Sequence, residues 1–309
     1  MKKRNKIVAL LLMLVLSMSL AACGNSKAGK EETSGNAGAE ADTPEDASAE
    51  KAKAPKEEKD PLEAAKENLN GVTSVDTLVE MEMDMVVNAN GEEQRAESVT
   101  SMDVSCIYDP LELKMDMTVE VSGETVTQSM YIENTDEGCV AYINDGSGWQ
   151  SQSISLTDAD QYNFSTDMEL YLNGDYQFRE NGMEEINGAN AYKYSGTIAG
   201  EEMKQLMLSS GALDSVTQMG GDISQIDSML DELGELTIDL WIDEATLYPV
   251  RYEIDMTESM DLLLSSIVEA MGEQGEGISM NVPKMVTRMT CSNYNGVTEI
   301  SIPEEAKGE

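Results

Sequence analysis

The sequence predicts an α+β protein in which a curved antiparallel β-sheet has one apolar face covered by amphipathic helices. Apolar and polar residues alternate with a period of two along many segments, which is the pattern of strands that bury one face. Short turn sequences such as Asn90-Gly91 separate these segments and fit hairpins between neighbouring strands. In two stretches, 199–233 and 257–271, the apolar period becomes that of a helix, which supplies a cover for the sheet.

A short helix and a long strand open the domain. We expect the helix to run from Pro61 to Leu69, because proline favours the first turn of a helix and Gly71 stands just past its end. The clearest strand lies at 79–87, where every second residue is Val or Met and the residues between them are mostly acidic.

The alternation recurs along the rest of the first half. It predicts further strands at 102–106, 111–121, 126–133 and 138–143, and one that begins at Trp149. Strands joined by consecutive hairpins form a meander, and we expect one face of this meander to be exposed to solvent.

The second half mixes the two periods. We expect a helix at 158–172, besides the two amphipathic stretches already named, and Gly220-Gly221 should weaken the first of those two. A glycine-rich segment, 272–277, is expected to be a mobile loop. The expected strands are 176–178, 183–186, 191–197, 236–242, 250–256, 285–291 and 297–302.

Composition excludes several classes of function. The formal net charge of −39 argues against nucleic acid as a partner, because that partner is itself negative. The chain contains no histidine, which removes Ser-His-Asp and Cys-His nucleophile systems and histidine-ligated zinc. Its many carboxylates alternate along strands, where a solvated face places them. We therefore predict no enzyme, no cofactor and no metal site.

The cysteines limit the number of possible disulfides. Besides Cys23, the chain has Cys106, Cys139 and Cys291, an odd number without CxxC spacing. At most one disulfide can form within a monomer, and any of the three pairs is possible.

Methionine is the unusual component, with 22 residues, some of them in Met-x-Met spacing. Alternate thioethers on one strand could bind Cu(I). These methionines nevertheless occupy the positions that the alternation assigns to the buried face, where flexible side chains fill irregular space. We interpret them as core or as the wall of an apolar pocket. The pocket residues predicted in this way are Met81, Met83, Met85, Met115, Met117, Ile238, Leu240, Met256, Leu263 and Ile267.

The N-terminus has the layout of a bacterial export signal, with a basic start, an apolar run and small residues before a cysteine. Residues 20–23, Leu-Ala-Ala-Cys, resemble the lipobox of bacterial lipoproteins. That resemblance implies cleavage between Ala22 and Cys23 and lipidation of Cys23. We expect a signal at 1–22, a lipidated acidic tether without fixed structure at 23–60, and a folded domain at 61–309.

The domain resembles the half-barrel lipoproteins of the LolA, LolB and LppX type. The resemblance rests on the Met- and acid-rich strands at 79–87 and 111–121, on the strand–turn–Pro–strand segment 240–252, and on the ending 293–306. It covers roughly residues 62–306. It implies a curved antiparallel β-sheet half-barrel whose sheet and helices enclose an apolar cavity for acyl chains.

The sequence thus predicts a lipoprotein anchored through Cys23 to lipid at the extracytoplasmic face of the cell membrane. Its ligand would be a lipid or another apolar molecule held between sheet and helices. Helix 257–271 and the loop after it are the expected moving part. The alternative is a solidly packed domain without a ligand, which acts as a surface protein-interaction or envelope-stress module.

Overall fold

The computed structural model describes residues 59–89, 91–135, 138–155, 168, 172, 176–199, 235–270 and 277–308. Within these residues the strands form one antiparallel sheet of eleven strands, in the order β6-β5-β4-β3-β2-β1-β11-β10-β9-β8-β7. Their bounds are β1 Ser74–Ala89, β2 Glu92–Tyr108, β3 Leu111–Val121, β4 Glu124–Thr135, β5 Gly138–Asn144, β6 Trp149–Ile154, β7 Arg179–Ile186, β8 Ala189–Ala199, β9 Glu235–Asp243, β10 Pro249–Asp255 and β11 Ile278–Ser292.

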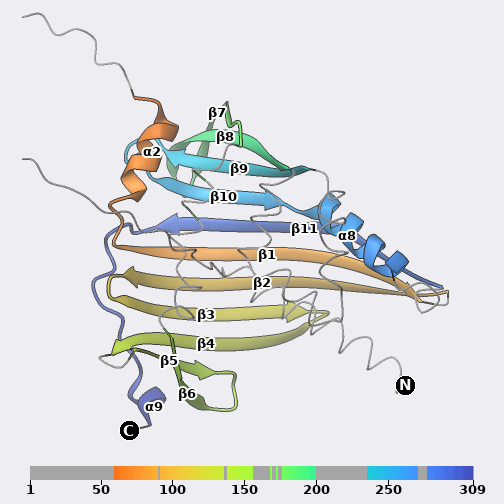
Figure 1. Cartoon of the computed structure of the whole chain (residues 1–309), viewed down its shortest axis with the longest axis horizontal. Helices are drawn as coiled ribbons and strands as arrows, with labels where there is room; N and C mark the ends of the chain where they lie inside the picture. The colour runs from red at the N-terminus through yellow and green to blue at the C-terminus, as the bar shows by residue number, and fades with distance from the viewer. Residues whose placement is uncertain are drawn as a thin grey trace, which may run out of the picture.

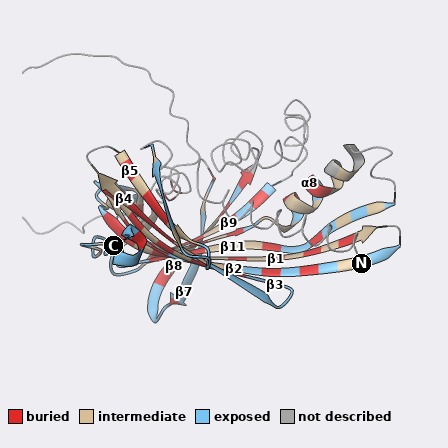
Figure 2. Ribbon diagram, turned by 90° about the horizontal axis from the view of Figure 1, so that it is seen from below, coloured by how far each residue is buried: buried red, intermediate tan, exposed pale blue. Residues whose placement is uncertain are grey.

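The sheet consists of two meanders that meet in its centre. Strands β1 to β6 follow one another in space as they do in the chain, and so do β7 to β11. The two halves join where β1 pairs with β11, so the first and last strands of the domain are neighbours. This sheet is open, with β6 and β7 at its edges, and it is strongly twisted and bent (Figure 2).

The helices whose bounds lie within the described residues are α2 Pro61–Leu69, α8 Thr257–Ala270 and α9 Glu304–Lys307. Figure 1 shows α2 at one end of the long central strands and α8 at the other, beside β11. The expected helix at 257–271 is thus confirmed, while the one at 199–233 lies outside the described residues. Met168 and Leu172 are helical, as expected for 158–172. None of the described helices has the length and apolar content that a membrane span requires.

Burial alternates along the central strands as the period of two predicts. In β1 the residues from Val79 to Val87 are buried at every second position, and Figure 2 shows the same alternation as bands along the ribbons. One cluster of buried side chains covers this inner face from β1 to β5 and across β11. We call the opposite side, which carries Glu80, Glu82 and Asp84, the outer face.

Two predicted strands are wrong. Residues 176–178 are not a strand. The pairing of β7 with β8 ends at Arg179 and Ser195, and beyond that point the segment only approaches β8 closely. The amide of Thr197 donates to the carbonyl of Tyr176 at 3.2 Å. Glycine at position 196 makes this close approach possible, since a Cβ there would lie 2.7 Å from the same carbonyl oxygen.

The segment 297–302 is not a strand either. It leaves the sheet after β11, and its Ile300 and Ile302 pack over the outward side chains Tyr131 and Tyr142. Partial burial of these isoleucines against the outer face replaces the strand pairing that their alternation indicated.

Candidate functional site

Methionines from five neighbouring strands gather on the inner face. Three pairs lie directly opposite each other across strands: Met83 and Met285, Met102 and Met117, and Met115 and Met130. Each of these six side chains is at most 6% exposed. The methionine band, as we call it, comprises Met81, Met83, Met85, Met102, Met115, Met117, Met130, Met285 and Met289.

Most of the residues predicted to form a pocket lie on this face. Met81, Met83, Met85, Met115, Met117 and Leu240 belong to the main buried cluster. Ile238 belongs to a smaller one, with Leu236 and Ile254. Met256 is partly buried and packs against both clusters, and Leu263 on α8 is 3% exposed. The side chain of Ile267, and all of Ala22 and Cys23, lie outside the described residues.

Sequence reasoning left four methionines out of the predicted pocket: Met102, Met130, Met285 and Met289. Each stands alone in its strand or four residues from the next methionine, so no Met-x-Met spacing marks it. The register supplies what the spacing lacks, because it places Met102 opposite Met117 and Met130 opposite Met115.

Sulfur also lines the region where β11 ends. The Cys291 thiol donates to the Met168 sulfur at 3.6 Å, and the hydroxyl of Tyr294 donates to the Pro249 carbonyl at 2.6 Å. All three cysteines outside the N-terminal segment are buried, reduced thiols. Burial raises the pKa of Cys106 to about 12 and that of Cys291 to about 11. These thiols are therefore protonated near neutral pH and behave as small apolar groups.

The polar residues buried in the described part of the chain are uncharged. They are Ser74, Thr77, Ser98, Thr100, Ser259 and Thr290. An interior with methionine, neutral thiols and a few hydroxyls can accept hydrocarbon, because it contains no charge that a hydrocarbon would leave without solvent.

The outer face carries the charges. Glu82 forms an ion pair with Lys284 across the β1–β11 pairing. The hydrogen bond that the Lys284 ammonium donates in this pair lowers the pKa of Glu82. Arg288 lies between two carboxylates, with nitrogen–oxygen distances of 2.8 Å to Glu253 and 3.9 Å to Glu80. Such partly exposed pairs contribute little stability each, and they keep this face in water.

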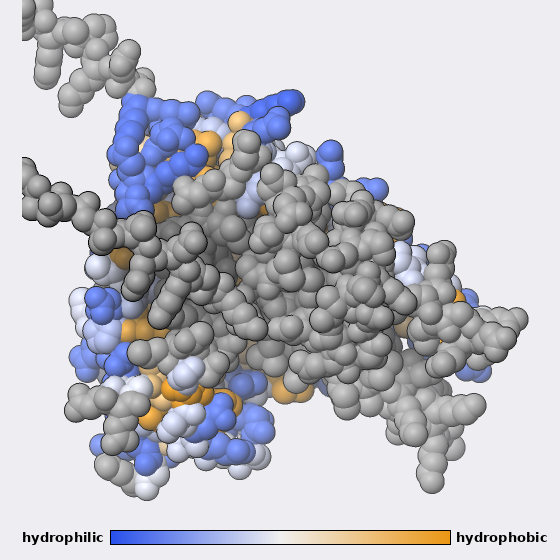
Figure 3. All heavy atoms as spheres, in the orientation of Figure 1, coloured by the Kyte–Doolittle hydropathy of each residue, from blue (hydrophilic) through white to orange (hydrophobic). Residues whose placement is uncertain are grey.

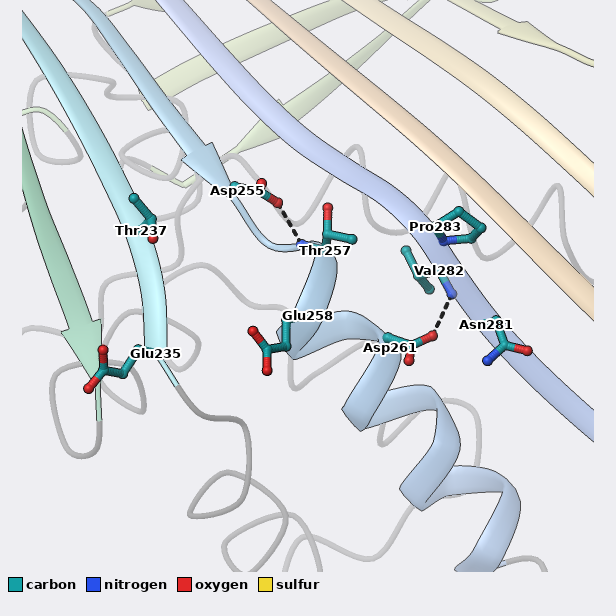
Figure 4. Close-up of a pocket in the computed structure, with 9 residues that line it drawn as sticks. All are labelled: Glu235, Thr237, Asp255, Thr257, Glu258, Asp261, Asn281, Val282 and Pro283. Atoms are coloured by element: carbon teal, nitrogen blue, oxygen red, sulfur yellow. Dashed lines mark hydrogen bonds between the residues drawn. The ribbon is translucent and has the colours of Figure 1, made fainter.

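A polar cleft of about 410 Å³ lies between the N-terminal turn of α8 and strands β9 to β11 (Figure 4). Two of its four acidic residues accept hydrogen bonds from backbone amides. The Asp255 carboxylate accepts from the Thr257 amide at 3.0 Å, and that of Asp261 accepts from the Val282 amide at 2.7 Å. The described residues bring no three His, Cys, Asp or Glu side chains together as a metal site would need. This cleft fastens α8 to the sheet and is not the apolar pocket that the sequence predicts. It is lined by Glu235, Thr237, Asp255, Thr257, Glu258, Asp261, Asn281, Val282 and Pro283.

Comparison with known proteins gives a family. The model of a family described as "Family of unknown function (DUF6612)" matches residues 59–309. No curated protein matches the chain in a sequence search.

Among solved structures, lipoprotein LppX from Mycobacterium tuberculosis is 16% identical, with a TM-score of 0.41, over 78% of this chain and 96% of that chain. LprF from Mycobacterium bovis is 17% identical, with a TM-score of 0.44, over 79% and 95%. A DUF1329 family protein from Desulfovibrio piger is 11% identical, with a TM-score of 0.19, over 77% and 93%. LppX, which names the type that the sequence resembles, is thus among the solved structures that the search matches.

Proposed function

The chain belongs to the DUF6612 family, and we propose that it is an extracytoplasmic lipoprotein which binds a lipid or another apolar ligand against its methionine band. The band is the observation that carries this proposal. Methionine side chains have three rotatable bonds and a polarizable sulfur, so they repack around ligands of different length at little cost.

The shape of the sheet supports an elongated ligand. Strand β1 has 16 residues, which corresponds to about 50 Å at ~3.3 Å per residue. Apolar side chains, interrupted only by the hydroxyl of Thr77, follow one face of β1 for most of that length, from Val75 to Val87. A hydrocarbon chain could lie along this face without meeting a charged side chain.

The proposed mechanism is sequestration. Transfer of an acyl chain from bilayer to protein exchanges one apolar environment for another. The free energy of the chain against the band therefore has to be similar to that in the bilayer, and the gain relative to water does not enter. No bond is made or broken in this step. The anchor proposed at Cys23 would keep the domain at the membrane, and the tether of residues 23–60 would set its reach.

A fluorescence titration tests this function. The domain, residues 59–309, is titrated with N-phenyl-1-naphthylamine, an apolar probe that brightens when it leaves water. We expect saturable binding that palmitate competes away. Met115→Gln should weaken probe affinity about tenfold, because it places an amide where hydrocarbon should lie.

The matched control is the next residue of β3. Asp116→Asn removes a charge from the outer face and should leave affinity unchanged. Circular dichroism shows whether both variants fold. Absence of saturable binding in the folded unmodified domain would refute the proposal and favour the packed interaction module.

A further inference from the structure

Helix α2 lies at one end of the central strands and is the first described element after the proposed tether (Figure 1). The expected tether runs directly into Asp60, the N-cap of this helix, whose carboxylate accepts from the Leu62 amide at 3.1 Å. Figure 1 shows α8 at the opposite end of the central strands. Any pull on the tether, or contact with the bilayer at this end, therefore reaches α2 before the rest of the domain.

The helix covers part of the main apolar cluster. Ala65 is fully buried in that cluster, Leu69 is 7% exposed and Leu62 packs against it from the rim. In the space-filling view, apolar residues reach the surface beside the hydrophilic atoms of α2 (Figure 3). Displacing α2 would thus open the apolar interior at this end.

Few polar contacts hold α2 to the sheet. The Tyr194 hydroxyl of β8 donates to the Asp60 carboxylate at 3.4 Å, and the others concern one turn. The Asn68 amide donates to the carbonyls of Thr246 at 3.2 Å and Leu247 at 3.1 Å, in the turn between β9 and β10. Leu247 has φ +56°, a left-handed conformation that is strained for leucine. Release of α2 removes one of the contacts that keep Leu247 in this conformation, so strain in the turn favours release.

A nine-residue helix is also too short to persist on its own in water. Its order depends on docking, which makes α2 a two-state element: docked and helical, or released and unfolded.

The far end is fastened differently. There α8 lies along the part of β11 that lacks a strand partner on that side, and its side chains satisfy the edge amides. Asp261 accepts from the Val282 amide at 2.7 Å, and the Thr257 hydroxyl accepts from the Met285 amide at 2.9 Å. Moving α8 would leave these partly buried amides without partners, which costs more than rehydrating the carbonyls of an exposed turn.

We propose that α2 is a plug, coupled to the tether, whose release opens the apolar interior toward the membrane and admits or discharges the ligand. This inference rests on the proposed function and places the portal at the anchored end. It assigns α8, the moving part expected from the sequence, to a fixed role.

Cross-linking tests which end opens. Asn68→Cys with Thr246→Cys joins α2 to its turn through a short bis-maleimide, and Asp261→Cys with Asn281→Cys joins α8 to β11. The three native cysteines of the domain are buried and should stay unmodified. Full-length protein is reconstituted in phosphatidylcholine vesicles that contain pyrene-labelled phosphatidylcholine, and loss of excimer fluorescence reports lipid leaving the bilayer.

We expect the α2 cross-link to slow transfer about tenfold relative to the same variant without cross-linker, and the α8 cross-link to change it by less than about twofold. An unchanged rate with α2 cross-linked, or slowing only with α8 cross-linked, overturns the plug.

Hydrogen exchange of the unmodified protein separates the two proposals. We expect vesicles to accelerate exchange of α2 amides and not of α8 amides. If no sample transfers lipid, lipid carriage is refuted. The hydrogen-exchange rate of the α2 amides then decides whether the helix undocks at all. Exchange in α2 that vesicles do not change overturns the plug even where transfer occurs.

Discussion

The two faces of the central strands are built from alternate residues of the same segments and have opposite chemistry. On β1 the inner positions carry Met81, Met83 and Met85, while the outer positions between them carry Glu82 and Asp84. A register slip of one residue would bring every charge inside and every methionine outside, so this alternation fixes the register of the sheet. We therefore expect substitutions on the inner face to alter folding and ligand binding. Substitutions on the outer face should change the surface charge and have little effect on either.

The largest contrast should come from neighbours in β1. Met83→Glu places a carboxylate opposite Met285 in the buried cluster, and we expect it to cost at least ~3 kcal/mol of unfolding free energy. Glu82→Gln removes only the partly exposed pair with Lys284 and should cost less than ~1 kcal/mol. Urea denaturation measures both. Equal losses would show that the faces are not distinct.

A second contrast concerns volume. Met102 is 2% exposed and faces Met117, so Met102→Ala should cost about 2–5 kcal/mol, whereas Met102→Leu should cost less than ~1.5 kcal/mol. Asp103→Ala, one residue along on the outer face, should stay within ~0.5 kcal/mol of the parent. Thermal unfolding followed by circular dichroism gives these values. A small loss for Met102→Ala would mean that the site is already loosely filled.

Thiol titration extends the contrast to alkaline pH. Burial raises the pKa of Cys106 from 9.0 to about 12, so the folded state keeps a proton that the unfolded state gives up above pH 9. This group's stabilising contribution is therefore complete below about pH 9 and decreases as pH rises toward 12. We expect Cys106→Ala to lose less stability than the parent between pH 9 and pH 11 in urea titrations. Parallel losses in the two proteins would contradict this assignment.

The smallest effect should be at the edge of the outer face. Lys307 pairs with Glu133 at 2.7 Å and lowers the pKa of that carboxyl, with a further contribution from the Tyr142 hydroxyl. The resulting stabilisation is present above the ordinary pKa of 4.5 and is lost as pH falls through the lowered value. Lys307→Met should raise the pKa of Glu133 toward normal and cost less than ~1 kcal/mol at neutral pH. NMR titration of the carboxyl carbon follows the shift, and an unmoved pKa would rule out the pair.

The fold was predictable wherever local pattern and sheet pairing agree. Strand β3 occupies 111–121 as the alternation predicts, and α2 occupies 61–69 as its proline and glycine indicate. Strand β2 was predicted only from residue 102, because Glu92 to Arg95 are all polar and take their extended form from pairing with β1. Strand β11 was predicted only from residue 285, because Pro283 interrupts the pattern at a point where the register with β1 shifts.

The sequence predicted that methionines line the inner face, but it did not identify all of them. Alternation was enough to assign Met81, Met83 and Met85 to the buried face. It could not show that Met285 lies opposite Met83, since that pairing joins residues far apart in the chain. For the same reason the contact of α2 with the turn at Leu247 could not be read from sequence.

Native mass spectrometry of residues 59–309, followed by solvent extraction, shows whether the domain carries a lipid against its methionine band. We expect a bound mass that leaves with solvent and is identified as a lipid, and we expect Met115→Gln to carry less of it than Asp116→Asn. A bare protein mass that stays bare after incubation with membrane lipids would contradict the account, because the inner face would then be a filled core.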